Sequence, residues 1–240
     1  MEVTPRWRDE LTRWPAFAPR FRIERQRTAL LVVDMQNGYV RPSSGLGRYL
    51  REQFPDLADY YLTRQAGLVI PNIARILAYF RRHDLPVVYI TFGAQRADAL
   101  DWLPSRRRVE EQVRAQTTHA TAVLVVGTPD HAIIEELAPR PNEPVLNKVT
   151  RGAFNSTGID QVLRNMGVHH LVAVGCITNV CVETTARDAV DRGYDCVVVE
   201  DATASFNPAF HDASLRAFAA TFGMVRTTAE VLAEMEEALG

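Results

Sequence analysis

Three chemically active side chains follow separate apolar runs of this chain. Asp34 ends the run that starts at residue 28, Lys148 ends the run that starts at residue 144, and Cys181 follows the run 170–175. A thiolate attacks a carbonyl carbon, and a nearby carboxylate can take the thiol proton and return it to a leaving amine. A lysine beside both lowers the thiol pKa and holds the acid in place. These residue types together predict hydrolysis through a cysteine nucleophile.

The stretch around Cys181 carries the strongest local signal. The apolar residues 171–174 stop at Gly175, a polar turn follows, and Cys181 stands where a helix is predicted to begin. The free N–H groups and the positive dipole end of a helix start favour a thiolate. The turn 175–180 can also donate N–H groups to a developing oxyanion.

Taken one at a time, the same residues fit structural roles. Asp34 can form a strand-end turn, Lys148 can be a surface cation, and Cys181 can be a small core side chain. Cys176 and Cys196 lie in or beside apolar runs and are predicted to be core residues. A cysteine–histidine dyad stays open from the sequence alone. The convergence of acid, lysine and thiol favours the catalytic interpretation.

Strand and helix patterns alternate along the chain. Apolar runs without alternation predict buried strands at 28–34, 85–91, 144–148, 170–175 and 195–200. Helical patterns lie at 66–83, 156–166, 180–192, 208–222 and 228–239, with a short segment, 224–227, before the last. The alternation predicts an α/β fold with three α/β/α layers and a mainly parallel, Rossmann-like sheet of about six strands. Ligands bind beyond the carboxyl ends of such strands, where the acid, lysine and thiol would meet and where Glu200 and Asp201 end the fifth run.

Several segments are less regular. Residues 41–64 and 93–126 are expected to be irregular loops that grip or cover substrate. Asp130 is expected to open a short helix over 131–137. Pro71 either kinks its helix or marks the start. The run 106–108, three arginines, is interpreted as a solvated helix face rather than a phosphate-binding patch.

Composition excludes several classes of function. The 240 residues are 47% apolar and 23% charged, with a formal net charge of −2, which gives no basic excess to attract nucleic acid or a membrane surface. The three cysteines have neither metal-binding nor disulfide spacing. Residues 1–20 lack the apolar core of a signal peptide, and no run reaches the length of a membrane span. We therefore expect a cytoplasmic protein without nucleic-acid or membrane partners.

Three motifs occur in order along the chain. They are residues 31–37, 146–157 and 175–189, and Gly193-Tyr194 and Glu200-Asp201-Ala202 follow them. Over 28–224 the chain resembles the isochorismatase-like cysteine hydrolases, which include nicotinamidases and N-carbamoylsarcosine, ureidoacrylate and biuret amidohydrolases. The resemblance implies an isochorismatase-like hydrolase domain over 28–240, preceded by an N-terminal arm over 1–27.

The resemblance also implies roles for particular residues. Asp34 is the general base and acid, Lys148 is the cation of the triad, and Cys181 is the nucleophile. The peptide bond between Cys176 and Ile177 is implied to be cis, which would turn the Ile177 N–H toward the oxyanion that the Cys181 N–H also serves. The implied reaction is hydrolysis of a small-molecule C–N bond, in an amide, carbamoyl or ureido group, through a thioester.

Departures from the family's patterns narrow this prediction. Nicotinamidases carry an Asp-x-His…His metal site after the first helix region, whereas residues 51–61 contain no histidine, so no metal and no other cofactor are expected. Members that hydrolyse the vinyl ether of isochorismate without a covalent step lack the cysteine. This chain keeps it, which favours amide or ureide hydrolysis, and an isochorismatase-type vinyl-ether hydrolase is the alternative. A non-catalytic binding protein on this fold is expected to have lost a triad position, and none is lost.

Substrate contacts and assembly complete the expectations. Candidate contacts near the triad are Gln36, Asn37, Tyr39, Phe92, Phe154 and Asn155, with a core role equally open for the two phenylalanines. The small apolar residues of helix 180–189, and Trp7 and Trp14 in the arm, predict a homo-oligomer, a dimer or a tetramer. The expected ligand is a small amide or ureide.

Overall fold

The computed structural model describes residues 6–11, 13, 18–117 and 123–238 and contains one six-stranded sheet. All strand pairs are parallel, in the order β3-β2-β1-β4-β5-β6. The strands are β1 (Thr28–Val33), β2 (Val87–Phe92), β3 (Val145–Lys148), β4 (His170–Cys176), β5 (Asp195–Ala204) and β6 (Met224–Arg226). The predicted parallel α/β sheet is confirmed, with β1 to β5 close to their predicted places and β6 within the short segment 224–227.

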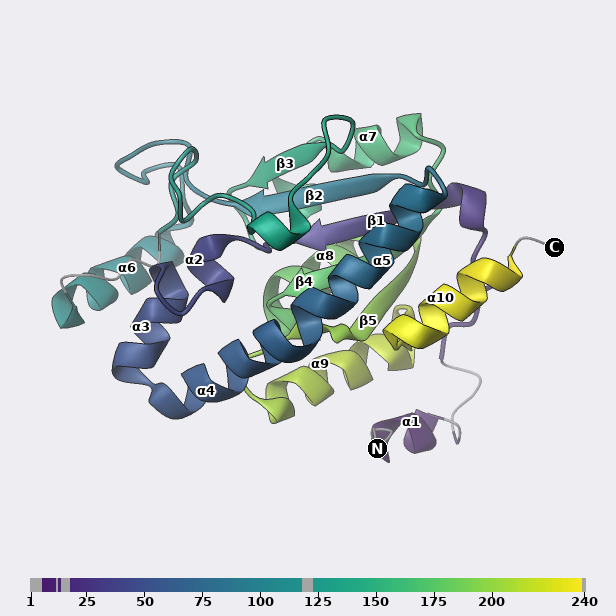
Figure 1. The fold of residues 1–240 in the computed structure, drawn as a ribbon, viewed down its shortest axis with the longest axis horizontal. Coiled ribbons are helices and arrows are strands. Elements are labelled where there is room, and N and C mark those ends of the chain that lie inside the picture. The colour runs from purple at the N-terminus through teal and green to yellow at the C-terminus, as the bar shows by residue number, and fades with distance from the viewer. Residues whose placement is uncertain (1–5, 12, 14–17, 118–122, 239–240) are drawn as a thin grey trace.

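Helices cover both faces of the sheet (Figure 1). They are α1 (Arg6–Leu11), α2 (Asn37–Val40), α3 (Gly45–Gln53), α4 (Pro55–Arg64), α5 (Ile70–Arg82), α6 (Pro104–Gln116), α7 (Ile159–Asn165), α8 (Glu183–Val190), α9 (Pro208–Thr221) and α10 (Thr228–Glu237). Helices α5 and α10 pack together on one face, and α8 and α9 pack together on the other. Helices α2, α3 and α6 lie beyond the carboxyl ends of the strands, where the arrows in Figure 1 point.

The two segments expected to be irregular contain helices, and the first of them is largely helical. Residues 41–64 contain α3 and α4, and 93–126 contains α6. Two glycines in α3 weaken the helical pattern of its sequence. A Cβ at Gly45 would lie 2.6 Å from the carbonyl oxygen of Gly38, and a Cβ at Gly47 would lie 2.1 Å from the carbonyl oxygen of Arg41. These glycines therefore serve close backbone packing between α2 and α3 rather than loop flexibility.

Two smaller expectations also need correction. The short helix expected over 131–137 is only a 3₁₀ turn, Glu135–Leu137, because Ile133 forms an antiparallel bridge with Gln36 instead. The helix expected over 66–83 continues back into α4 through a π-helical turn, Gln65–Val69. Pro71 is the second residue of α5, just after that turn. A widened turn accommodates a residue that cannot donate an N–H and whose ring crowds the preceding turn.

The site lies at the topological switch point of the sheet, where the strand order reverses between β1 and β4. The connection from β1 leads to β2 on one side, whereas β4 pairs with β1 on the other, so a crevice opens between the ends of β1 and β4. Gly175 stands opposite Val33 in this pair with φ at +116°, and a Cβ there would lie 2.0 Å from the carbonyl oxygen of Val33. Glycine thus lets the two strand ends approach.

The described part of the N-terminal arm folds against the domain. Helix α1 contacts α9, Trp7 is buried, and Arg8 forms ion pairs of 3.0 Å with Glu200 and 3.1 Å with Glu230. The expectation of an exposed interface aromatic is therefore wrong for Trp7, since its ring packs within its own chain. Trp14 lies outside the described residues.

Candidate active site

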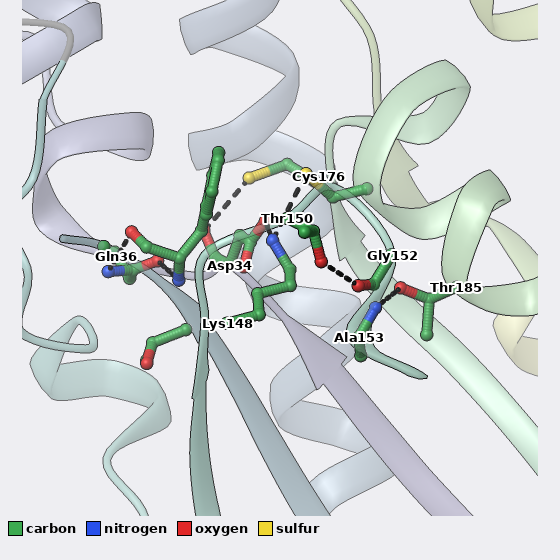
Figure 2. Close-up of polar contacts among 12 residues, drawn as sticks. Asp34, Gln36, Lys148, Thr150, Gly152, Ala153, Cys176 and Thr185 are labelled. Carbon is green, nitrogen blue, oxygen red and sulfur yellow. Dashed lines mark hydrogen bonds and ion pairs between the residues drawn. The ribbon is translucent and has the colours of Figure 1, made fainter. Parts of the chain in front are cut away.

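The acid, the lysine and the thiol meet at the ends of three strands. Lys148 Nζ lies 2.8 Å from Asp34 Oδ2 and 3.4 Å from Cys181 Sγ, and all three side chains are buried. Figure 2 shows Asp34 and Lys148 pointing toward one another. Asp34 follows β1 with φ at +53°, a left-handed conformation that aspartate tolerates better than most residues. The structure therefore brings together the residues that the sequence singled out.

Lys148 reaches the site across a neighbouring strand. It ends β3 in register with Phe92 of β2, and its Nζ lies 4.0 Å from the centre of the Phe92 ring. Asp34 lies one strand further on, after β1. A long, thin side chain with a compact charge can cross the ring and still reach the carboxylate. Lys148 is also the only lysine among the 27 lysine and arginine residues of the chain.

Burial is the largest influence on the pKa values of Asp34 and Cys181. It raises the pKa of Asp34, which the ammonium of Lys148 opposes. It raises the pKa of Cys181 to about 12, with a further rise from the Asp34 carboxylate and an opposing effect from Lys148. Burial thus opposes the thiolate that a helix start favours. A nucleophilic role for this thiol would require a base to take its proton.

One oxygen of Asp34 is suited to accept this proton. Oδ2 accepts from Lys148, whereas Oδ1 is buried and has no hydrogen-bond partner in the part of the chain that the structure describes. An unsatisfied buried carboxylate oxygen is a strong acceptor. Asp34 and Cys181 are also near enough for each to shift the pKa of the other.

The loop after each strand is held by hydrogen bonds. Beyond Lys148, Thr150 Oγ1 donates to the carbonyl of Gly152 at 2.8 Å, and the N–H of Ala153 donates to Thr185 Oγ1 of α8 at 3.2 Å (Figure 2). The loop that follows the lysine is thereby joined to the helix that follows the thiol.

The turn between β4 and the thiol is fixed on both sides. The Cys176–Ile177 peptide bond is cis, as the resemblance implied, and Cys176 Sγ donates to the carbonyl of Asp34 at 3.2 Å (Figure 2). Thr178 Oγ1 lies 2.9 Å from Nδ1 of His211, whose Nε2 lies 3.0 Å from an N–H of Arg64. Burial lowers the pKa of His211 to about 3, and nearby Arg64 adds to the fall, so this imidazole is neutral.

A cavity of about 280 Å³ opens onto the thiol. It is lined by Asp34, Tyr39, Leu46, Leu50, Phe92, Arg106, Arg151, Cys176, Ile177, Val180, Cys181 and Phe206. A larger hollow of about 650 Å³ beside α6 contains none of the three central residues, so its size does not make it the reaction site. The smaller cavity suits a small molecule with a reactive carbonyl.

The predicted substrate contacts divide into two groups. Tyr39 and Phe92 line the cavity. Gln36 lies outside the lining, and its amide bonds with Phe92 and His131 backbone groups at 2.8 Å each. Asn37 also lies outside, where it donates to the carbonyl of Pro129 at 2.9 Å.

The residues after the lysine strand lie away from the cavity as well. Phe154 packs against Tyr194 with ring centres 6.0 Å apart and carries Arg192 over its face. Asn155 donates to Asp188 at 2.8 Å. Glu200 and Asp201, expected at the end of a strand, lie inside β5, where Glu200 pairs with Arg8 and Asp201 accepts from Thr228. These residues support the fold around the site.

Two arginines in the lining were missed by sequence reasoning. Arg106, in the first turn of α6, faces the cavity with its guanidinium 5.4 Å from the centre of the Trp102 ring, so a solvated face is the wrong interpretation for it. Arg151 comes three residues after Lys148. Arg151 could have been identified from its place inside the second motif, 146–157. Arg106 could not, because the sequence of its helix shows no clear hydrophobic periodicity.

The described residues lack two features. They contain no group of three or more histidine, cysteine, aspartate or glutamate side chains arranged to hold a metal ion. No helix among them has the length and apolar character needed to cross a membrane.

Comparison with known proteins places the chain in a family. The model of the isochorismatase domain matches residues 28–230. The chain is 34% identical over 216 residues to the ureidoacrylate amidohydrolase RutB of Caulobacter segnis (87% of this chain, 85% of that protein) and 36% identical over 193 residues to RutB of Pantoea ananatis (77% and 72%). A solved cysteine hydrolase from Pseudomonas syringae pv. phaseolicola superposes with a TM-score of 0.75 at 29% identity (92% and 98% covered). N-carbamoylsarcosine amidase from Thermoplasma acidophilum gives 0.59 at 26% (84% and 96%). The chain therefore belongs to the isochorismatase family of hydrolases.

Proposed function

We propose that this hydrolase cleaves a C–N bond of a small amide, carbamoyl or ureido compound through a thioester on Cys181. The observation that carries the proposal is one buried cluster in which Lys148 Nζ contacts both Asp34 and Cys181, at 2.8 Å and 3.4 Å, beside a cavity of about 280 Å³. A thiol, a base with a free oxygen and a fixed cation are the parts that covalent hydrolysis of a carbonyl requires.

The acylation half begins with a proton transfer. Oδ1 of Asp34 takes the proton of Cys181 as Sγ bonds to the carbonyl carbon, and the ammonium of Lys148 stabilises the charge that moves onto sulfur. The backbone N–H groups of Ile177 and Cys181 are the proposed donors to the oxyanion. The C–N bond then breaks, and Asp34 returns the proton to the leaving nitrogen, so ammonia or an amine departs from a thioester.

The deacylation half uses the same groups in reverse. Asp34 takes a proton from a water molecule as the water oxygen bonds to the thioester carbon. The C–S bond breaks, and Asp34 returns the proton to Cys181. The acid product leaves, and the starting protonation of the cluster is restored.

The relatives support the class of substrate. Two of them are named ureidoacrylate amidohydrolases and one solved structure is an N-carbamoylsarcosine amidase, and the names of all three describe cleavage at an amide-type C–N bond. A vinyl-ether hydrolase needs no thiol, whereas the lysine here contacts the thiol directly. The cluster therefore favours the amidohydrolase over that alternative.

A screen for released ammonia tests the proposal. We expect wild-type protein to release ammonia or amine from at least one of a panel of ureides, carbamoyl amino acids and carboxamides, and iodoacetamide to abolish the release. A panel on which no member is hydrolysed, or activity that survives complete alkylation of Cys181 confirmed by peptide mass, would refute it. Cys196, buried away from the cavity, serves as the reference thiol in the same peptide map.

A further inference from the structure

The charges on the cavity lining are unbalanced. Among the described residues that line it, Asp34 is the only carboxylate and is already paired with Lys148. Arg106 and Arg151 add two guanidinium groups to the same lining, and its remaining members are apolar apart from Tyr39 and the two cysteines. A cavity of this kind favours an anionic ligand, because the low-dielectric walls strengthen the field of the two cations.

Arg106 is held toward the reacting groups by a stack of rings. Its guanidinium lies over Trp102, whose ring centre is 4.8 Å from that of Phe92, and Phe92 lies under Lys148. Trp102 is 2% exposed, so the stack is a rigid support. Arg106 and Tyr39 line the same cavity, and the charge of Arg106 opposes the rise that burial causes in the pKa of Tyr39.

Tyr39 supplies an independent sign of a ligand. Its side chain is 5% exposed and lines the cavity, and its hydroxyl has no hydrogen-bond partner among the described residues. A buried hydroxyl without a partner costs about 1–3 kcal/mol unless a ligand or water satisfies it. The hydroxyl can donate to an anion that Arg106 also holds.

Arg151 adds a second guanidinium to the cavity from the loop that follows β3. It is exposed, and the described residues offer it neither a side-chain hydrogen bond nor an ion pair. Its neighbour Thr150 is held by hydrogen bonds to Gly152 and Ser156 in the loop that follows Lys148, and from this loop the Arg151 side chain reaches the cavity lining.

We propose that the substrate carries a carboxylate, which Arg106 and Arg151 bind with the hydroxyl of Tyr39 while its C–N carbonyl faces Cys181. The planar fork of a guanidinium matches the two oxygens of a carboxylate. The inference rests on the proposed function and narrows it to ureido or carbamoyl acids. Neutral amides of the same size lack the group that these side chains recognise.

A matched pair of ureides tests the carboxylate site. The pair is 3-ureidopropionate and propylurea, which share the ureido group and differ in the terminal carboxylate. We expect kcat/KM to favour the acid by at least about 100-fold, and Arg106→Gln and Arg151→Gln each to raise KM for the acid about 10- to 100-fold, with kcat and the propylurea reaction little changed. Arg108→Gln, an exposed neighbour on α6 outside the lining, should leave both reactions unchanged.

Binding to Cys181→Ala protein separates this inference from the proposed reaction. Calorimetric binding of 3-ureidopropionate that is lost when Arg106→Gln is added to the same protein supports the site even if the wild type hydrolyses no member of the ammonia-release panel, an outcome that refutes the proposed function alone. Equal kcat/KM for the acid and propylurea overturns the carboxylate site. The carboxylate site is also overturned if an arginine variant lowers kcat/KM for the acid and for propylurea by the same factor. Tighter binding of the phosphonate analogue of 3-ureidopropionate overturns it as well.

Discussion

The contact between Lys148 and Asp34 gives the sharpest perturbation. Replacing Lys148 with methionine removes the ammonium and keeps an unbranched side chain of similar length in a fully buried position. At the observed 2.8 Å, Coulomb attraction is about 6 kcal/mol with an effective dielectric constant of ~20. Without it, burial alone acts on Asp34, whose pKa is already raised. The carboxyl therefore holds its proton to higher pH and stops serving as a base near neutrality.

The assay is the pH dependence of kcat/KM for the best substrate of the ammonia screen. Lys148→Met should lower kcat/KM at pH 7 by about 10³-fold or more, because a positioned base contributes about 10²–10⁴-fold. The acid limb of the profile should move to higher pH. Infrared difference spectra against Lys148→Met/Asp34→Asn should show a protonated carboxyl that the wild type lacks at the same pH.

Controls separate this effect from unfolding. Urea unfolding of Lys148→Met must remain cooperative, since removing one partner of a buried pair costs about 3–5 kcal/mol before protonation relieves the remaining charge. Lys148→Arg keeps the charge but brings a broader head into the space over Phe92, so it should retain more activity than methionine and less than lysine. A methionine variant within tenfold of wild type, with an unmoved acid limb, would refute the reasoning.

Three further outcomes follow from the same structure. In wild-type kcat/KM profiles the acid limb should lie above pH 3.8, because the pKa of Asp34 is raised and only its carboxylate can accept the thiol proton; a limb at or below that pH contradicts the assignment. Unfolding free energy should fall between pH 7 and pH 4, with about 3 kcal/mol due to His211, since the unfolded imidazole takes a proton near pH 6.5 and the folded one only near pH 3. Urea titrations at both pH values should show a smaller fall for His211→Gln, and an identical fall would refute the role of this histidine. Gly175→Ala should destabilise the fold by about 3 kcal/mol or more, because its Cβ would lie 2.0 Å from a carbonyl oxygen of β1; a cost under about 1 kcal/mol in urea unfolding contradicts the close approach.

The sheet and the central cluster were predictable from the sequence for a common reason. Uninterrupted apolar runs identify buried parallel strands, and the chemistry of such sheets lies at the carboxyl ends. Asp34 and Lys148 stand at those ends, and Gly175 marks the crossing beside β1. One further signal was available in the composition: the single lysine of the chain is the buried one, which argues against the surface role that lysines usually have.

The rest of the site depends on tertiary contacts that no local pattern encodes. Arg106 lines the cavity because Trp102 packs on Phe92, a contact between separate segments of the chain. Gln36 was predicted to contact substrate because it follows Asp34 closely in the sequence. Its amide instead forms hydrogen bonds with the backbone of Phe92 in β2 and of His131. The thiol pKa also depends on tertiary structure, because burial of Cys181 raises it and the position of the residue before a helix does not reveal that burial.

The central claim is that Cys181 forms a covalent bond with substrate, and the activity of Cys181→Ala tests it most directly. The comparison is kcat/KM for ammonia release by wild type, Cys181→Ala and Cys196→Ala, each shown to be folded by urea unfolding. Cys181→Ala should lose at least about 10³-fold, because removing a nucleophile leaves only binding and oxyanion stabilisation, whereas Cys196→Ala should stay within tenfold. A Cys181→Ala protein that hydrolyses the substrate within tenfold of the wild type would contradict the account.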